Sequence, residues 1–336
     1  MIKIIVSLSP SLIFLLCLQL LDSYKLVKLR TVLLLIVSGA VTALAAYFIN
    51  VNFIELFELE TRFFSKFIAP VIEELLKASV IIFFMYRNRI GFIVDAAIFG
   101  FAVGAGFATL ENIYYLGNLG EANITIWIIR GLGTAIMHAC TTAIFSMISK
   151  YYIDKKSHKS LLTVFPLIIV PVLIHMLFNN FVLPPVAFTA LQLTITPVLF
   201  YLIFLQSEMQ LKEWMELSLE SNQELLASIN EGVLLESKAG RYLNTLKNKF
   251  SPLVLADLIC YVRLYIELSM LSKGLLIMKE AGFVPPISND LKSKLEEIKF
   301  LERNIGYTGK LAIQPIVYNE KGIGWIKDLL LDQRVK

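Results

Sequence analysis

Residues 92–118 read FIVDAAIFGFAVGAGFATLENIYYLGN, a long apolar run with one acidic residue near its start and another well inside it. An α-helix rises about 1.5 Å per residue, so about 20 apolar residues cross the hydrocarbon layer of a membrane. Inserting a charged side chain there costs at least about 2.5–3.5 kcal/mol. The run therefore predicts a membrane-spanning helix in which Glu111 has a function, whereas Asp95 is expected to be a solvated residue at the helix end.

Six more stretches of the chain have a similar length and composition. They are residues 4–22, 32–50, 67–86, 125–149, 161–181 and 184–206. Of the 336 residues, 57% are hydrophobic and 17% are charged, whereas a soluble domain carries about 25% charged residues. The sequence thus predicts an all-α fold, a polytopic bundle of about seven helices that spans a lipid bilayer.

Charge divides the chain into two parts near residue 206. Residues 1–206 hold 14 of the 31 Lys and Arg and 10 of the 27 Asp and Glu, and residues 207–336 hold the remaining 17 of each kind. We therefore expect a transmembrane domain followed by a soluble domain that is mainly helical, with amphipathic helices near 208–228, 252–280 and 290–305. The second domain has no catalytic motif and is expected to regulate or to bind a partner. Its neutral charge gives no indication of nucleic-acid binding.

The Lys and Arg residues between the spans predict the orientation, because cytoplasmic loops are enriched in them. With the N-terminus outside, the inner loops hold nine such residues and the outer segments hold three. The C-terminal domain then lies in the cytoplasm. The first span is expected to be a retained helix and not a cleaved signal peptide, because only Lys3 precedes it and no small-residue cleavage site follows it.

Four successive spans, the third to the sixth, carry polar side chains that are costly in a membrane. They are Glu73, Glu74, Lys77, Glu111, Asn112, Arg130, His138, His175 and Asn179. In the orientation above they lie in the outer half of the membrane, which predicts one polar cavity open toward the outside. Gly100, Gly104 and Ala108 recur every fourth residue. They predict a close contact with another helix, which turns Glu111 toward the interior.

Helical spacing indicates which of these charged side chains meet. Lys77 is four residues from Glu73 and three from Glu74, so its ammonium group can reach either carboxylate. Arg130 stands near the outer end of its span, where it either reaches the interface or pairs with Glu111.

Carboxylates, histidines and an amide in a partly dry cavity suit the hydrolysis of a peptide bond. In one version a glutamate acts as general base toward a water molecule, a histidine positions the water, and Asn179 donates to the oxyanion. In a second version a zinc ion on His138, His175 and a glutamate activates the water. The first version needs no cofactor and is favoured, because the chain lacks the HExxH motif.

Four motifs occur in four successive spans in the order found in a known family. They are Glu73-Glu74-x-x-Lys77, Phe107-x-x-x-Glu111-Asn112, Arg130 followed by His138, and His175-x-x-x-Asn179. With this order, roughly residues 65–182 resemble the PrsW family of intramembrane proteases, which belongs to a wider group with the CAAX prenyl endopeptidases and bacterial Abi-type proteins. The CAAX-type members carry a histidine in place of Glu111 and an arginine in place of Lys77.

The resemblance implies a peptidase embedded in a bacterial cell membrane. In the better-known members the substrate is an anti-sigma factor, a membrane-anchored protein cut on its extracytoplasmic side as the first step of regulated proteolysis. The expected catalytic residues are Glu73, Glu74, Glu111, His138, His175 and Asn179. By similarity the first glutamate of the pair is the base and the second is its partner, whereas His175 and Asn179 position the water and bind the oxyanion.

Two other classes of protein fit parts of this pattern. A proton- or cation-coupled transporter or channel also uses membrane carboxylates and histidines, but it needs ionisable groups along the full thickness, and the inner half of these spans is nearly bare. A catalytically silent scaffold with the same fold is the third reading. The retained glutamate pair, histidines and asparagine argue against it.

Overall fold

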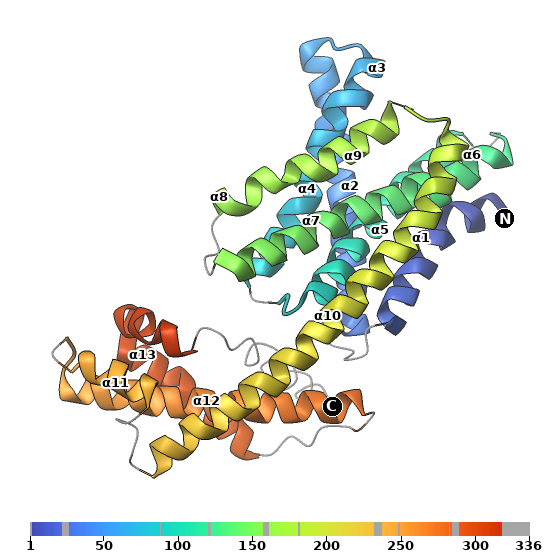
Figure 1. Ribbon diagram of the computed structural model, residues 1–336. Coiled ribbons are helices and arrows are strands. Elements are labelled where there is room, and N and C mark those ends of the chain that lie inside the picture. The colour runs from blue at the N-terminus through green and yellow to red at the C-terminus, as the bar shows by residue number, and fades with distance from the viewer. Residues whose placement is uncertain are drawn as a thin grey trace. The chain divides into compact units, whose positions relative to one another are not determined.

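The computed structural model places most of the chain, and every secondary-structure element in the described part is a helix (Figure 1). The described residues are 2–21, 27–87, 89–119, 122–156, 161–180, 182–231, 237–247, 249–281, 283 and 289–317. They fall into two compact units, Met1–Ser207 and Glu208–Lys336, which are described separately below.

The first unit is built from long helices, several of which contain a short stretch of different winding. Its elements are α1 (Ile2–Leu21), α2 (Leu29–Phe57), α3 (Thr61–Phe63), the π-helix η1 (Phe64–Ile68), α4 (Ala69–Tyr86), α5 (Ile93–Asn118), α6 (Ile124–Ile128), the π-helix η2 (Ile129–Thr134), α7 (Ala135–Lys156), α8 (Leu161–Val164), the 3-10 helix η3 (Phe165–Ile168), α9 (Ile169–Asn179) and the beginning of α10 (Pro185–Asn230). The segments α3–η1–α4, α6–η2–α7 and α8–η3–α9 each run without a break from one element to the next.

Five helices in the described residues are long and apolar enough to cross a membrane. They are Ile2–Leu20, Leu29–Phe57, Ile93–Asn118, Ile124–Asp154 and Pro185–Gln206. The two other expected spans, 67–86 and 161–181, contain the helices η1–α4 and α8–η3–α9. However, α4 carries three charged residues, and the apolar helix Phe165–Asn179 is shorter. Seven spans thus remain a prediction.

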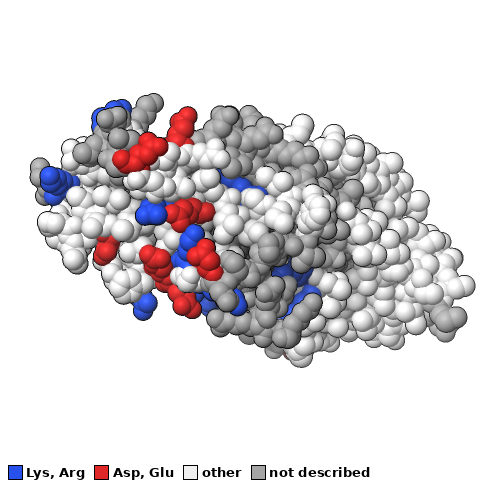
Figure 2. Space-filling model, turned by 90° about the horizontal axis from the view of Figure 1, so that it is seen from below, with Lys and Arg blue, Asp and Glu red and all other residues white. Residues whose placement is uncertain are grey.

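The outer surface of the spans agrees with a lipid environment. Large apolar side chains such as Leu33, Val37 and Val41 of α2 are more than half exposed. In Figure 2, a continuous part of the visible surface consists of described residues that are not Lys, Arg, Asp or Glu. Because water would oppose the exposure of so many apolar side chains, these helices are suited to a membrane.

Helix α5 lies at the centre of the first unit, with α7 and α2 packed against it. A Cβ atom at Gly100 would lie 2.5 Å from Cα of Ala143 in α7, and one at Gly104 would lie 2.6 Å from Cα of Ala139. The predicted small-residue face of this helix is therefore confirmed. Because the two backbones touch, α5 and α7 are held at a fixed register, which brings together the polar residues near the end of α5 and the beginning of α7.

The prediction that Asp95 is a solvated end residue was wrong. Asp95 is 5% exposed, and its Oδ2 accepts hydrogen bonds from the backbone N–H groups of Gly91 (3.0 Å) and Phe92 (2.9 Å). A helix begins with N–H groups that have no partner inside the helix, and this carboxylate serves backbone groups at the start of α5. The residue is a helix cap.

The second unit contains the end of α10 together with α11 (Lys238–Thr245), α12 (Pro252–Glu280) and α13 (Asn289–Val317). Apolar side chains of α11, α12 and α13, such as Leu243, Leu258 and Leu295, form its core. The backbone of Gly306 has φ 63°, which interrupts α13 one residue after the end of the predicted helix 290–305. The sequence interpretation did not include α11.

Candidate active site

The two neighbouring glutamates of α4 lie in different surroundings, because consecutive residues of a helix point about 100° apart. Glu74 is 1% exposed, and its Oε1 lies at the centre of a set of polar contacts. It accepts from Lys77 Nζ (2.6 Å) and from the Thr141 hydroxyl (3.3 Å), and it lies 2.9 Å from Nδ1 of His175. The lysine, which can reach either carboxylate by spacing, thus pairs with Glu74.

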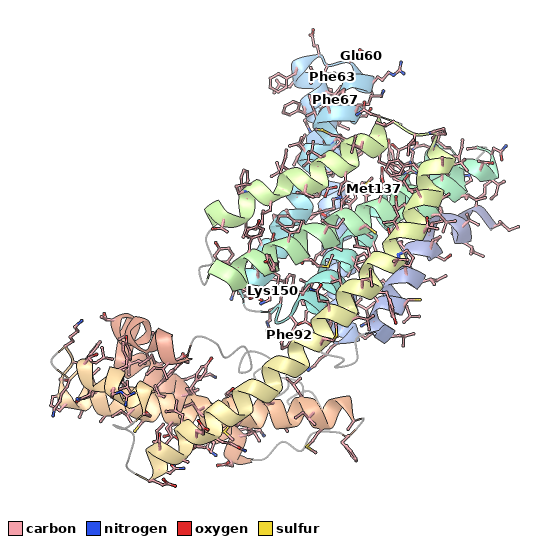
Figure 3. All side chains as sticks on the ribbon, in the orientation of Figure 1. Glu60, Phe63, Phe67, Phe92, Met137 and Lys150 are labelled. Carbon is pink, nitrogen blue, oxygen red and sulfur yellow. The ribbon has the colours of Figure 1, made fainter. Side chains whose placement is uncertain are left out.

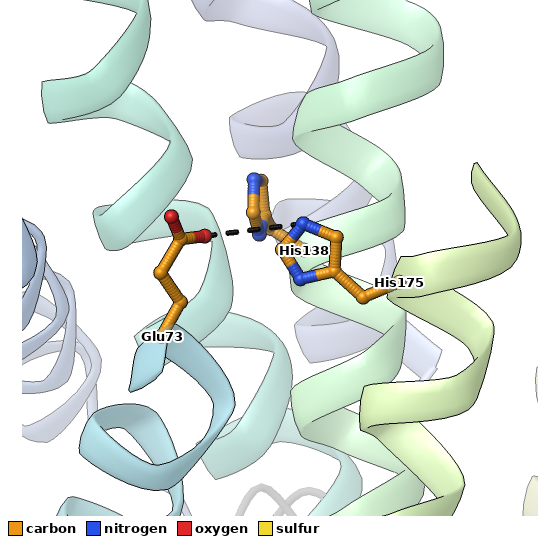
Figure 4. Close-up of side chains that lie close together, drawn as sticks. All are labelled: Glu73, His138 and His175. Atoms are coloured by element: carbon orange, nitrogen blue, oxygen red, sulfur yellow. Dashed lines mark ion pairs between the residues drawn. The ribbon is translucent and has the colours of Figure 1, made fainter. Parts of the chain in front are cut away.

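Glu73 is held more loosely than Glu74 and lies on the more exposed side of the polar cluster. Its side chain is 15% exposed, its Oε1 accepts from Asn50 Nδ2 of α2 at 3.4 Å, and its Oε2 lies 3.9 Å from Nε2 of His175. In Figure 4, Glu73 points toward His175, with His138 beside them. Glu73 is therefore the member of the pair that is positioned to take a ligand.

His175 of α9 is oriented by the buried carboxylate. We assign the Nδ1 proton to the hydrogen bond with Glu74, because an ionised carboxylate only accepts. This tautomer leaves the lone pair of Nε2 directed toward Glu73. A carboxylate behind a histidine is the usual partner that fixes the ring of a metal ligand.

His138 of α7 is contacted at both ring nitrogens. Its Nδ1 lies 3.0 Å from Lys77 Nζ, which has only donors, and its Nε2 lies 3.2 Å from Oε2 of Glu111 in α5. Nδ1 therefore accepts, and the ring proton is placed on Nε2, beside Glu111. Its ring meets the His175 ring edge-on, with centroids 4.7 Å apart. Met137, labelled in Figure 3, precedes it inside the first unit and is 1% exposed.

One ligand atom from each of Glu73, His138 and His175 lies within 4.8 Å of the others. Imidazole nitrogens and a carboxylate oxygen are zinc ligands, with bonds of about 2.0–2.2 Å. Ligation by His138 requires that one of its two contacts be exchanged. The contact to Glu111, whose side chain is 25% exposed, is the one that can move, since Lys77 is fully buried. With this exchange the donor set fits a metal ion.

The rim of the site contains an arginine and an asparagine. Arg130 Nη2 lies 3.4 Å from Oε1 of Glu111, so the predicted pairing of these two residues is confirmed. Asn179, expected at the oxyanion, instead donates from Nδ2 to the backbone carbonyl of Ser65 in η1 at 3.0 Å. The structure thus brings five of the six expected residues together. The amide of Asn179 is instead bound to the backbone of the neighbouring π-helix η1.

Side-chain amides also donate hydrogen bonds to backbone carbonyls of the two π-helices that precede the site residues. Besides Asn179 on Ser65, Gln192 donates to the carbonyl of Gly133 (3.2 Å) and Asn112 to that of Arg130 (3.5 Å). A change in helical winding shifts backbone hydrogen bonds, and a carbonyl in a membrane needs a partner within the protein. These amides therefore stabilise the segments that place Glu73 and His138.

Three contacts of the site were missed by sequence reasoning. Thr141 follows His138 by three residues, so helical spacing alone contains the signal for its contact with Glu74. The contact between Lys77 and His138 joins two helices and has no local signal. The same holds for Asn50, which reaches Glu73 from α2.

Comparison with models of known protein families gives one match, to the PrsW family intramembrane metalloprotease, over residues 28–206. The match covers more than half of the chain. The chain belongs to the PrsW family. It is therefore a peptidase and a multi-pass membrane protein. The resemblance drawn from the four motifs is confirmed. No curated protein and no solved structure gives a match.

The PrsW match begins at residue 28, so it includes every helix that contributes to the donor set and leaves α1 outside. Residues 207–336 also lie outside it. The family description names a metalloprotease, and the chemistry of the cluster formed by Glu73, His138 and His175 agrees with that description.

Proposed function

We propose that this PrsW-family protein is an endopeptidase that hydrolyses a peptide bond of a membrane-anchored protein near the outer face of the membrane. The observation that carries the proposal is the donor set of Glu73, His138 and His175, which come from three helices and have ligand atoms within 4.8 Å. This donor set and the family description favour the metal-dependent version over the metal-free version that the sequence favoured.

Glu73, His138 and His175 are the residues that hold the metal ion in this proposal. A divalent cation such as zinc, when bound, activates a water molecule and polarises the scissile carbonyl. Glu74 orients His175 through Nδ1, and Lys77 neutralises Glu74 while it contacts His138. These buried residues keep the ligands in place and do not touch the substrate.

Glu111 is the carboxylate that we assign to proton transfer. It lies beside Nε2 of His138, and its partial exposure gives it access to water. A general base must stand within hydrogen-bond reach of the proton that it removes. Glu111 accepts a proton from the attacking water at a carboxylate oxygen and passes it to the nitrogen of the leaving amine.

The topology completes the proposal. The segments η1–α4 and α8–η3–α9 lie within the membrane with the five candidate spans, which gives seven crossings and places the site in the outer half. The protein then lies in a bacterial cell membrane with its C-terminal unit in the cytoplasm. The support is the charge of the loops, in which nine Lys and Arg lie on one side and three on the other. An anti-sigma factor is the substrate that the family resemblance favours.

The test compares the membrane proteomes of cells that express the wild-type protein, Glu73→Gln or Glu55→Gln. Glu55 is exposed near the end of α2 and serves as the matched control. A single-pass protein is expected to accumulate uncut with Glu73→Gln alone, with its cleavage site on the outer side. If no membrane protein changes and ion flux instead depends on Glu73, the protein is a transporter and the proposal is wrong.

A further inference from the structure

Helix α1 has two neighbouring backbone carbonyl groups, those of Val6 and Ser7, that meet other helices. Pro10 lies inside the helix and has no N–H to offer to the carbonyl of Val6, four residues earlier. Gly131 of η2 packs on this spot. A Cβ atom there would overlap the Val6 carbonyl oxygen and lie 3.0 Å from its carbonyl carbon. Only glycine allows α1 and η2 to approach this closely.

The next carbonyl of α1, that of Ser7, accepts a hydrogen bond from another helix. The Nδ2 atom of Asn112 in α5 donates to it at 2.8 Å, and both residues are almost completely buried. The other end of the same amide, Oδ1, accepts from Nε of Arg130 at 2.9 Å. Asn112 therefore connects the backbone of α1 to the guanidinium group of Arg130.

Arg130 transmits this connection to the active site. Its guanidinium carbon lies 3.6 Å from the centre of the Tyr115 ring, and Nη2 lies 3.4 Å from Oε1 of Glu111. The other carboxylate oxygen of Glu111 lies 3.2 Å from Nε2 of His138. The guanidinium group of Arg130 thus donates a hydrogen bond to the Asn112 amide through Nε and pairs by charge with Glu111 through Nη2.

We propose that α1, which lies outside the family match, is part of the support of the active site. Through Asn112 and Arg130, the Ser7 carbonyl keeps the Glu111 carboxylate at the edge of the site, also when Nε2 of His138 exchanges its contact with Glu111 for the metal ion. Asn112 and Arg130 are positioning residues in this proposal, since they act on Glu111 and not on the substrate. The assignment rests on the proposed function for its effect on cleavage, whereas its effect on the His138 ring is independent of it.

The expected size of the effect follows from the geometry of Glu111. Its side chain is partly exposed and has freely rotating bonds, so without the arginine its carboxylate turns away from the site. A displacement of about 1 Å at a reacting group costs on the order of 10²-fold in rate. The loss is expected in kcat with little change in KM, because the substrate is not contacted by the residues that are changed.

Two substitutions disturb the α1 contact in different ways. In Asn112→Asp the side chain still accepts from Arg130 Nε but no longer donates to the Ser7 carbonyl, nor to the Arg130 carbonyl. In Gly131→Ala the new methyl group forces η2 away from α1. Gly117→Ala is the matched control, because nothing lies within 4 Å of a Cβ atom at that position in α5. Both test variants are expected to lower kcat on the substrate found by proteomics by 10-fold or more, and Gly117→Ala to leave it unchanged.

A second readout does not depend on proteolysis. The chain has three histidines, so the ring signals of full-length protein labelled with ¹⁵N-histidine can be assigned by substitution. In lipid nanodiscs, as purified and after EDTA treatment, the His138 Nε2 signal is expected to shift in Asn112→Asp and Gly131→Ala but not in Gly117→Ala. If the His138 signal shifts in the two variants but the wild-type protein cleaves no substrate, only the proposed function is overturned. If the wild-type protein is active but the His138 signal is unshifted in both variants, the role of α1 is overturned.

A double-mutant cycle tests the route through Glu111. If Arg130 acts by positioning that carboxylate, Arg130→Met and Glu111→Gln together reduce kcat no more than Glu111→Gln alone. Losses that multiply instead show that the arginine acts elsewhere, and the proposed connection is then wrong. Arg130→Lys is expected to recover little of the rate, because an ammonium group cannot reproduce the guanidinium fork.

Discussion

The polar cluster has a packed side and an open side, and the two differ in how firmly their carboxylates are held. On the packed side, Glu74 is 1% exposed and has partners at 2.6 and 2.9 Å. On the open side, Glu73 and Glu111 are 15% and 25% exposed, and their closest histidine contacts are 3.9 and 3.2 Å. The packed side is a scaffold that orients rings, whereas the open side is free to exchange partners for a metal ion, water or substrate.

The largest expected effect breaks the packed side. Lys77→Met leaves the Glu74 carboxylate buried without its counter-charge, which costs about 3–5 kcal/mol. Thermal unfolding in detergent is expected to occur at a much lower temperature than for Ser79→Ala, a control at an exposed position of the same helix. Adding Glu74→Leu to Lys77→Met removes both charges and is expected to recover stability but not cleavage. Unchanged unfolding of the single variant contradicts a buried ion pair.

The two glutamates are expected to separate activity from stability. Glu73→Gln removes a metal ligand on the open side, so cleavage falls on the order of 10³-fold or more. Its unfolding temperature stays near that of the wild type, because its side chain has only long contacts. Glu74→Gln loses cleavage and also unfolds at a lower temperature, because it leaves the Lys77 ammonium group unpaired. Equal stability losses in both variants would remove the distinction between the two sides.

Metal removal tests the open side directly. Chelation of the purified protein is expected to abolish cleavage, and added zinc to restore it. Glu74→Gln keeps all three donors but loses the carboxylate behind His175, so its zinc affinity is expected to fall about 10–100-fold. Isothermal titration of zinc into the wild type, Glu74→Gln and Glu55→Gln measures the difference. Cleavage that persists after complete metal removal returns the assignment to a glutamate acting alone.

Several features of this site follow from sequence and others depend on packing between helices. The positions of Glu73, Glu111, His138 and His175 on successive helices were predicted from the cost of polar groups in a membrane, and the structure brings them together. The choice of Lys77 between two glutamates was not predictable, because spacings of three and four are both allowed in a helix. Side chains on other helices decide it.

The winding of the helices is the second feature that the sequence does not contain. The π-helices η1 and η2 depend on amide donors from other helices, such as Gln192 on Gly133. The same cause explains why the partner of Asn179 was not foreseen, since Ser65 lies 114 residues away in the chain. The Asp95 interpretation failed for a simpler reason. Because Asp95 lies near the end of a helix, it was expected to be exposed to solvent, although a helix-capping residue can be buried.

Asn179→Ala distinguishes a packing role from an oxyanion role. Its hydrogen bond to the Ser65 carbonyl lies at the surface, so its loss is expected to cost about 1 kcal/mol of stability. Cleavage then falls by less than about 10-fold, through a looser contact between α9 and η1. Loss of an oxyanion donor instead costs about 10²–10³-fold in kcat. Initial rates measured with saturating substrate decide between these two ranges, and a loss in the higher range restores the original assignment of this residue.

The smallest expected effect on cleavage is that of Asp95→Ala, because Asp95 is in neither side of the cluster. Its carboxylate serves the backbone N–H groups of Gly91 and Phe92, and loss of such a cap costs about 0.5–2 kcal/mol. The unfolding temperature is expected to fall while kcat and KM remain within about twofold of the wild type. Asp95→Asn keeps an acceptor oxygen and is expected to lose less stability than Asp95→Ala. Because α5 also holds Glu111, a large change in kcat would mean that the start of this helix controls the position of its C-terminal end. The open side would then be less independent than its loose contacts indicate.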